Sequence, residues 1–528
     1  MTGLRWAAAM ATVAAATLAL TACSSETTTS DTLRYGLSSA PSCADPAQAS
    51  TNQTVNVARQ VVDSLVDQNP GTGEITGWLA QQYAISDDGR SFTFTLRPDV
   101  TFSDGTPLTS TVVKQNFDAL TTQASSTRTL QASGFLLGYD RTDTPDPHTA
   151  VVHFKQPNVQ FLQAAATTQL GILAAATVSK TFDERCRGET VIGSGPYTYQ
   201  AWDQNRSITL AARQDYRWAP EIGFSPEVRY RTVEFSVVPE SGVRSGSISG
   251  GQLDAIADPQ PQDRAALESV GARFVSRPNP GLPYILQANL SRGVLADPVV
   301  RQAVSSSLNR QVLVDTALGA GFRPATSVLA STTPGYRADP ELGFDPDVAR
   351  SGLDRAGWAV GSDGIRIRAG QRLSFDVIYS PEFYANKPIL ELAQQQLRDS
   401  GIDMTITALS NDDFLTRRAD GRFDAVYYNV TRADPDILRS RIGVQGTNFS
   451  RRAVDPATDP LLEAQAGIAD RRERLALVDR IQSRLLSVDY AIPIVELSQV
   501  AAVAPGYPGV GFDASGVLRL QFDEETAR

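Results

Sequence analysis

Apolar and polar residues alternate strictly over several short stretches of the chain. In "SFTFTLRPDVTFSDG", Phe92, Phe94 and Leu96 occupy every second position and are separated by threonines. A period of two places apolar side chains on one face of a β-strand. The pairs Asp88–Gly89 and Asp104–Gly105 that flank this stretch are typical of tight turns between antiparallel strands. We therefore expect a region rich in β-hairpins here.

Helical spacing of apolar residues dominates other segments. Val57, Val61, Val62, Leu65 and Val66 in "VNVARQVVDSLVDQ" lie on one helical face, which predicts a helix over residues 55–68. Further along, five segments alternate as strand, helix, strand, helix and strand: "RLSFDVIYS", "NKPILELAQQQLRDSGI", "MTITAL", "NDDFLTRRAD" and "RFDAVYYNV". That order is typical of a layered α/β lobe.

End signals support several of these helices. Ser110 precedes the helical pattern "TVVKQNFDAL" and is expected to cap it. Asp297 is the expected cap of a helix with Pro298 at its first position, and Gly401 ends the pattern that begins near Asn386. Between these regions, "RPNPGLPYILQANL" (277–290) is rich in Pro and Gly and suits a crossing between two lobes.

The N-terminus has the pattern of a secretory signal. Arg5 precedes an apolar run from Trp6 to Leu20, and small residues follow before Cys23. The motif "LTAC" resembles the bacterial lipobox, which implies cleavage after residue 22 and a lipid on Cys23; a plain secretory signal or an unprocessed anchor is the alternative. Residues 23–32 are polar and suit a flexible tether.

The chain has 3 cysteines and 2 histidines. If Cys23 carries lipid, Cys43 and Cys186 remain as a pair in an oxidising compartment, where they form either a disulfide or two buried free thiols. His148 and His153 lie five residues apart in a strand-like pattern, so they point to opposite faces and cannot chelate one metal ion. We expect no metal site and no cofactor.

Length and charge narrow the class of protein. With 528 residues, the chain is too long for one hydrophobic core, and two or three domains are expected. The net charge of −10 argues against nucleic-acid binding, which needs a concentrated basic face. A secreted hydrolase would need a nucleophile with a base, a zinc pair or paired acids, and neither GxSxG nor HExxH is present. We expect no enzymatic activity.

Six segments in a characteristic order identify the family that the chain resembles. They are "FTLRPDVTFSDGTPLTS", "IGSGPYTY" with "RQDYRW", "ADPVVRQAVSSSLNRQVLVDTALG" with "GFRPA", "DRAGW", "QQQLRDSGIDMTI" and "GRFDAVYYNVTRADPD". They resemble the solute-binding proteins of ABC importers in the dipeptide, oligopeptide and nickel family. The resemblance runs from about Leu33 to the C-terminal strand.

This resemblance implies an α/β fold of the two-lobe periplasmic-binding-protein type, in its large peptide-binding class, with an extra hairpin-rich subdomain. Lobe one would comprise residues 33–277, with an insertion at about 55–191, and the C-terminal return 487–528. Lobe two would comprise residues 278–486. The lobes would close on a solute and present it to a membrane permease with a separate ATPase. We expect a monomer outside the cytoplasm, held to the membrane only by lipid.

The stretch "VYYNVTRADPDILRSRI" (426–442) ends a strand in a charged loop, where α/β lobes commonly bind ligands. Asp434 can cap a helix that starts at Pro435. Peptide-binding relatives often carry an acid three positions earlier, which grips the ligand's ammonium; here that position is Thr431, followed by Arg432. The departure means that another acid substitutes or that no free amine is gripped. Arg432 either pairs with an anionic group of the ligand or is simply solvated.

Other residues are expected to line the ligand site from strand ends and crossings, although each has core or surface packing as an alternative. They are Ser38, Ser39, Ser42, Tyr284, Tyr428, Asn429, the segment "TSVLASTTPGY" (326–336) and the stretch from Tyr379 to Tyr384. The resemblance puts di- or oligopeptides first as solutes. The missing acid also leaves a metal chelate or metallophore, an opine-like anion, or a blocked peptide. An envelope lipoprotein for adhesion or sensing is the alternative from another class.

Overall fold

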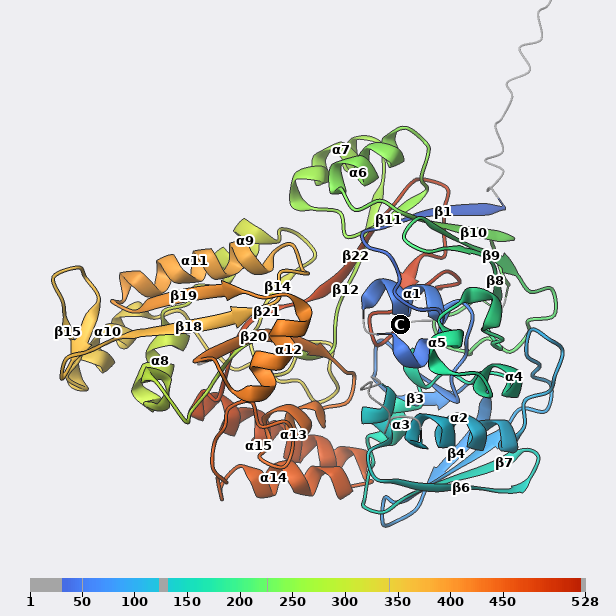
Figure 1. Cartoon of the computed structure of the whole chain (residues 1–528), viewed down its shortest axis with the longest axis horizontal. Coiled ribbons are helices and arrows are strands. Elements are labelled where there is room, and N and C mark those ends of the chain that lie inside the picture. Colours follow the sequence, from blue (N-terminus) through green and yellow to red (C-terminus); the bar gives the residue numbers. More distant parts are fainter. Residues whose placement is uncertain (1–30, 50, 123–131, 226, 341, 524–528) are drawn as a thin grey trace, which may run out of the picture.

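Two separate β-sheets organise the chain into two lobes that lie side by side (Figure 1). The computed structural model describes residues 31–49, 51–122, 132–225, 227–340 and 342–523. We call the part built on the seven-stranded sheet lobe one and the part built on the six-stranded sheet lobe two. The predicted two-lobe α/β architecture is confirmed.

The sheet of lobe one has the order β12-β22-β11-β1-β10-β9-β8. Its strands are β1 (Thr32–Leu37), β8 (Tyr197–Asp203), β9 (Ser207–Ala212), β10 (Thr232–Val237), β11 (Ala255–Ala257), β12 (Arg273–Pro278) and β22 (Ser498–Val503). Strand β1 is central and runs parallel to both neighbours, β10 and β11. The carboxyl ends of β1 and β11 therefore meet at one edge of this sheet.

A second, four-stranded sheet forms the inserted hairpin-rich part of lobe one. Its order is β4 (Ala80–Ile85), β5 (Ser91–Leu96), β7 (Thr149–Phe154) and β6 (Tyr139–Asp146). The predicted alternation in β5 is confirmed, because Phe92, Phe94 and Leu96 are buried while the threonines between them are half-buried. His153 lies on β7 beside Asp143, whereas His148 is exposed in the preceding turn.

Helices cover these sheets of lobe one. They are α1 (Asn52–Arg59), α2 (Ser110–Thr122), α3 (Phe161–Ala164), α4 (Ala175–Val178), α5 (Phe182–Arg185), α6 (Ser241–Ser249) and α7 (Arg264–Ser269). Ser110 is the first residue of α2 rather than its cap, since its hydroxyl donates to the carbonyl of Asp146. The hydroxyl of Thr109 instead accepts from the N–H of Val112, at 3.4 Å.

The sheet of lobe two has the order β14 (Arg323–Pro324), β21 (Ala491–Glu496), β13 (Gly281–Ala288), β20 (Ala425–Thr431), β18 (Ser374–Tyr379) and β19 (Asp403–Ala408). Its helices are α8 (Pro298–Ser306), α9 (Arg310–Ala317), α10 (Pro346–Arg355), α11 (Asn386–Asp399), α12 (Asn411–Asp420), α13 (Ile437–Ile442), α14 (Asp459–Ala464) and α15 (Arg471–Val488). The predicted strand–helix order from β18 to β20 is confirmed.

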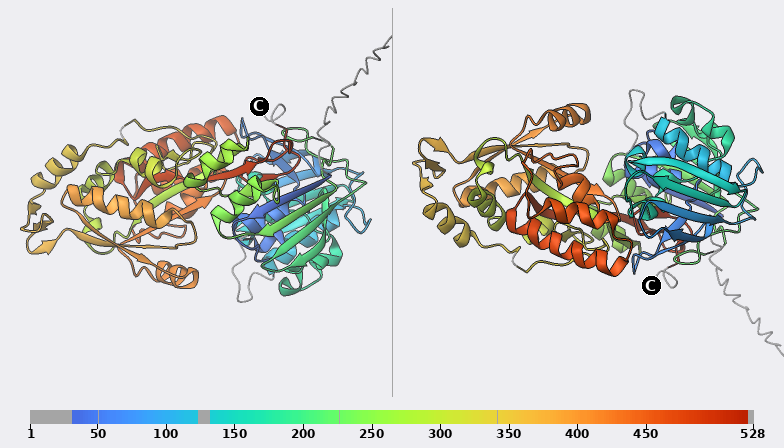
Figure 2. Two further views of the ribbon diagram at one scale, coloured as in Figure 1. Left: turned by 90° about the horizontal axis from the view of Figure 1, so that it is seen from above. Right: turned by 90° about the horizontal axis from the view of Figure 1, so that it is seen from below.

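Both faces of this sheet are covered by helices (Figure 2). One core packs Leu286 and Tyr427 against α8 to α11, and the other packs Ile285 and Val426 against α12 to α15. All of β13 is consequently buried. The predicted end signals also hold here: Asp297 accepts from the N–H of Val299 at 3.0 Å, and Gly401 follows α11 with φ +79°.

Two adjacent chain crossings join the lobes. Strands β12 and β22 pair antiparallel up to Pro278 and Ser498, and the N–H of Asn279 then donates to the carbonyl of Leu497 at 2.7 Å. Beyond that point the same two segments pair as β13 and β21 in lobe two. Strand β21 therefore belongs to lobe two, and the chain returns to lobe one at residue 497, not at 487 as the sequence suggested.

A disulfide joins Cys43 and Cys186, as one of the two sequence-based alternatives proposed. It ties the loop after β1 to the end of α5, and the N–H of Ala44 also donates to the carbonyl of Cys186. Cys23, the signal segment and most of the tether lie outside the described residues. None of the helices in the described ranges has the length and apolar character needed to cross a bilayer.

Candidate functional site between the lobes

The loop after β20 sits at the sheet edge where the parallel strands β18 and β20 both end. Thr431 is the last residue of β20 and pairs with Gly281 at the start of β13. Its hydroxyl oxygen accepts a hydrogen bond from Asn279 Nδ2 at 2.8 Å. Thr431 therefore lies beside the crossing, and its side chain is engaged by the crossing segment.

Asp434 forms a buried ion pair instead of capping a helix. Its two carboxylate oxygens accept from Arg474 of α15 at 2.6 and 2.8 Å. It also accepts from the N–H of Asp436, but α13 begins only at Ile437. Burial would raise the pKa of Asp434, yet the charge and hydrogen bonds of Arg474 hold it below its usual range. The expected capping role is thus replaced by a contact with a distant helix.

Asp436 is neutralised in the same way. It is fully buried and accepts from Arg439 at 2.7 and 2.8 Å, and Gln465 donates to it as well. Both acids of the "DPD" motif are therefore paired with arginines of lobe two. Neither carboxylate is left to bind a cationic group of a solute.

Arg432 reaches from lobe two to lobe one. Its guanidinium carbon lies 4.7 Å from the ring centre of Phe135, and Nη1 lies 3.5 Å from Gln160 Oε1. Both partners belong to the inserted part of lobe one, in the turn Ala132–Leu136 and immediately before α3. The contact is a stacking interaction with one long hydrogen bond, which leaves most of the donors of Arg432 unused.

Arg432 also lacks a counterion among the described residues. None of the ion pairs among the described residues involves it, and its Nε is buried without a hydrogen-bond partner there. Burial, followed by the nearby charge of Arg441, lowers its pKa to about 10. The side chain stays cationic at neutral pH. Arg432 is half-buried, and a partly desolvated arginine without a carboxylate partner in the described part of the chain is a candidate site for an anionic group.

Three tyrosines that were expected to line the site are core residues of lobe two. Tyr284 stacks on Tyr427 with ring centres 4.8 Å apart, and Tyr379 is buried in the same core. Tyr428 is buried on the opposite face of the sheet, where its hydroxyl donates to Gln287. We therefore assign Tyr284, Tyr379 and Tyr428 to packing. Asn429 is half-buried on β20.

The serines after β1 lie at the edge of lobe one. Ser39 is exposed, whereas Ser38 is half-buried and its hydroxyl donates to Asp258 Oδ2 at 2.5 Å. Ser42 donates its N–H to Thr54 at the start of α1. Asp258 follows β11, the parallel neighbour of β1, so Ser38 and Asp258 both come from carboxyl strand ends. This is the position at which open α/β sheets bind ligands.

Sequence reasoning missed Asp258 and Gln53, whereas Tyr384 lies at the end of the stretch 379–384 that was expected to line the site. Gln53 Nε2 donates to Asp258 Oδ2 at 2.8 Å. Tyr384 of lobe two is close enough to Asp258 for the charge of that carboxylate to raise the pKa of the Tyr384 hydroxyl, although burial is the larger cause. An available signal was the acid that directly follows the apolar strand "AIA". Nothing in the sequence, however, indicated which strand would neighbour β1.

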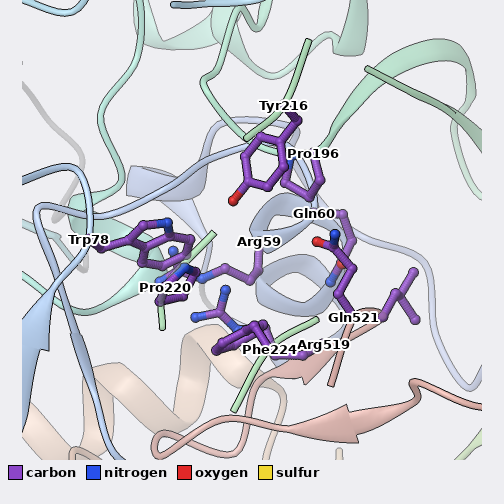
Figure 3. A pocket seen from close by; sticks show the side chains of 10 residues that line it. Arg59, Gln60, Trp78, Pro196, Tyr216, Pro220, Phe224, Arg519 and Gln521 are labelled. Atoms are coloured by element: carbon purple, nitrogen blue, oxygen red, sulfur yellow. The ribbon is translucent and has the colours of Figure 1, made fainter. Parts of the chain in front are cut away.

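A separate hollow lies inside lobe one, lined by Arg59, Trp78, Tyr216 and Arg519 among others (Figure 3). Its arginines already have partners within lobe one: Arg59 donates to Thr168, Ser64 and the carbonyl of Ala166. Arg519 pairs with Asp513 and stacks against Trp78 and Phe224. The hollow is a polar part of the lobe-one core and does not involve lobe two.

Comparison with known proteins agrees with this architecture. The chain is 24% identical over 447 residues to the nickel-binding periplasmic protein of Escherichia coli K12, which covers 82% of this chain and 83% of that protein. Its fold matches NikA from Brucella suis in complex with Fe(III)-EDTA, with a TM-score of 0.80, 23% identity and coverage of 93% and 99%. It also matches DppA from Helicobacter pylori in complex with the peptide STSA, with a TM-score of 0.72, 21% identity and coverage of 93% and 97%.

The family model for the bacterial extracellular solute-binding proteins, family 5, matches residues 74–444. Relatives of this family are binding proteins of ABC transporters and not enzymes. The two sheets, the paired crossings and this match together identify the chain as a member of family 5 of the bacterial extracellular solute-binding proteins, an extracytoplasmic receptor that binds a solute for an ABC importer.

Proposed function

We propose that the protein captures a peptide or peptide-like solute that carries an anionic group, and that Arg432 binds this group between the lobes. The single observation that carries the proposal is Arg432 itself, which contacts lobe one through Phe135 and has no carboxylate partner among the described residues. A carboxylate or phosphate could take two parallel hydrogen bonds from its guanidinium.

The relatives support this solute class without defining the solute. DppA from Helicobacter pylori binds a peptide, and NikA from Brucella suis binds a carboxylate-rich iron chelate. Both kinds of molecule carry carboxylates, which an unpaired arginine would recognise. A peptide comes first in our proposal; a chelate or an opine-like anion, which shares the carboxylate chemistry, comes second.

Native mass spectrometry of the protein purified gently from its native host tests this proposal. We expect an added mass that denaturation releases, and we expect tandem spectra of the released solute to show a carboxylate or another acidic group. A protein that carries no solute from the host would contradict the proposal. A bound solute without any acidic group would contradict the role of Arg432.

A paired set of variants then tests the residue. Arg432→Ala should weaken binding of the released solute by at least about tenfold, since removing one partner of a buried charge pair costs about 2–5 kcal/mol. Arg206→Ala is the control, because the side chain of Arg206 is 84% exposed on lobe one. Equal affinity of the Arg432→Ala variant and the wild type, measured by calorimetry, would show that Arg432 does not bind the solute.

We further propose that the receptor is a monomer held to the membrane by a lipid on Cys23. The support is the motif "LTAC" after an apolar segment, followed by a polar tether. Growth with an alkyne-tagged fatty acid should label the wild type and leave Cys23→Ser unlabelled. Label in the Cys23→Ser variant would contradict the lipid site. Light scattering of the chain without its signal segment should give the mass of one copy.

A further inference from the structure

Asp258 is a half-buried acid in an unusual setting at the edge of lobe one. It follows β11 in the left-handed backbone region, with φ +50°. Its Oδ2 accepts from Ser38 at 2.5 Å and from Gln53 at 2.8 Å, while the described residues offer Oδ1 no hydrogen bond. Both donors are neutral, so they solvate the carboxylate without balancing its charge.

The nearest cation does not pair with this carboxylate. Arg244 is buried and donates to four backbone carbonyls, those of Val238, Pro239, Ala257 and Asp258 itself. No arginine, lysine or histidine of the described residues forms an ion pair with the Asp258 side chain. Burial is the main cause that raises the pKa of Asp258, and Arg244 offsets it only in part. The acid is therefore left with a charge that a ligand could balance.

Two further acceptors near Asp258 have no hydrogen-bond partner among the described residues. Gln53 is 4% exposed, and its Oε1 is buried with no hydrogen bond in the described part of the chain. The hydroxyl of Tyr384, in the loop between β18 and α11 of lobe two, is likewise buried and unpaired there. The lobes approach closely beside this group, because a Cβ built on Gly319 of lobe two would lie 3.3 Å from Pro261.

A primary ammonium matches this set of atoms. It offers three N–H donors and one positive charge, and the group offers a carboxylate, an amide oxygen and a phenol oxygen. The match also answers the question raised by Thr431, where an acid is missing from lobe two. We propose that Asp258, Gln53 and Tyr384 form a subsite for the ammonium group of the solute, with its charge balanced from lobe one.

The subsite rests on the proposed function, since we assign it to the same solute that Arg432 binds. A solute with an amine at Asp258 and an anionic group at Arg432 is zwitterionic. This places unblocked peptides and amino-acid conjugates ahead of blocked peptides and ahead of simple polyanionic chelates.

The test uses the solute released from the wild-type protein by denaturation, in two forms. One portion is left unchanged and the other is treated with acetic anhydride, which acylates amines and removes their charge. Both are titrated by calorimetry into ligand-free, refolded wild-type protein, Asp258→Asn and Asp347→Asn. Asp347 is the matched control, because its side chain is 89% exposed on lobe two.

We expect the unchanged solute to bind wild type and Asp347→Asn equally and to bind Asp258→Asn at least tenfold more weakly. Acetylation of the solute should weaken its binding to wild type at least tenfold. It should weaken binding to Asp258→Asn much less. Tyr384→Phe, which removes one acceptor and keeps the ring, serves as a second variant; it should weaken the unchanged solute more than the acetylated one.

Two results would overturn the subsite: a released solute whose mass acetic anhydride does not change, or equal binding of the unchanged solute to wild type and Asp258→Asn. In either case Arg432→Ala can still lose binding, so the proposed function would survive. A wild-type protein that carries and rebinds no solute would overturn the proposed function, and the subsite with it.

Discussion

At the scale of single residues, the charged loop after β20 shows how sequence and structure differ. The Asp-Pro-Asp pattern correctly indicated a turn into a helix, but it could not reveal that Arg474 would neutralise Asp434 from 40 positions away. Arg432 was recognised as a candidate anion site because of its type and place. That none of the described carboxylates forms an ion pair with Arg432 became visible only once the partners of both neighbouring acids were known.

The Asp434–Arg474 pair leads to a stability prediction. Asp434→Asn should lower the free energy of unfolding by about 3–5 kcal/mol, because it leaves a buried arginine without its counterion. Chemical denaturation would measure the change. The double variant Asp434→Leu/Arg474→Leu should lose less than the sum of the two single leucine variants, and strictly additive losses would contradict the pairing.

Asp63 leads to a pH-dependent prediction. It is fully buried beside Trp218, and burial raises its pKa to about 6. An unfolded aspartate releases its proton near pH 3.9, so between these values the folded state binds more protons and stability falls as pH rises. Wild type should therefore lose up to about 3 kcal/mol between pH 4 and pH 7 relative to Asp63→Asn. Parallel pH–stability curves for the two proteins would contradict this.

At the scale of elements, most helices and strands followed from periodicity, and the departures have tertiary causes. The helical pattern over residues 55–68 continues past Arg59, where α1 ends, and residues 66–68 become β2. The carbonyl of Val61 accepts from Gly195 at 2.9 Å, and this contact with a distant loop takes the chain out of the helix. Likewise, the apolar run 491–496 could not indicate which sheet it would join.

The crossing segment contains a glycine that the fold requires. Gly281 has φ +106°, and a Cβ built on it would lie 2.4 Å from the carbonyl oxygen of Val430. Gly281→Ala should therefore destabilise the protein more than Gly105→Ala, which has φ +82° but no atom within 4 Å of its added Cβ. The control should lose about 1–2 kcal/mol from backbone strain alone. Equal losses of stability for the two variants in thermal unfolding would show that the crossing segment rearranges to accommodate the added methyl group.

At the scale of the whole molecule, one covalent link and two crossings hold distant parts together. The Cys43–Cys186 disulfide closes a loop of 143 residues within lobe one. Cys43→Ser/Cys186→Ser should lower the free energy of unfolding by about 2–5 kcal/mol, because the unfolded chain regains freedom. A reducing agent should destabilise wild type and leave the double variant unchanged. An effect of reduction on the double variant would point to another cause.

The two-lobe arrangement itself was predictable, because six motifs in a fixed order carried it. The proposed solute position was only partly predictable, since it would be assembled from residues near the strand ends of both sheets. Arg432 comes from lobe two, whereas Asp258 and Gln53 come from lobe one and are 205 positions apart. No local pattern in the sequence connects such residues. The pairing of β1 with β11 brings Asp258 beside Ser38, and Gln53 reaches both from α1.

The central claim is that a zwitterionic solute lies between the lobes, with its anionic group on Arg432 and its ammonium on Asp258. A crystal structure of the protein purified with its native solute tests this most directly. We predict density that contacts both lobes, with an acidic group at the Arg432 guanidinium and an amine within hydrogen-bond distance of Asp258, Gln53 and Tyr384. A solute that contacts neither Arg432 nor Asp258, or that lies on one lobe alone, would contradict the account.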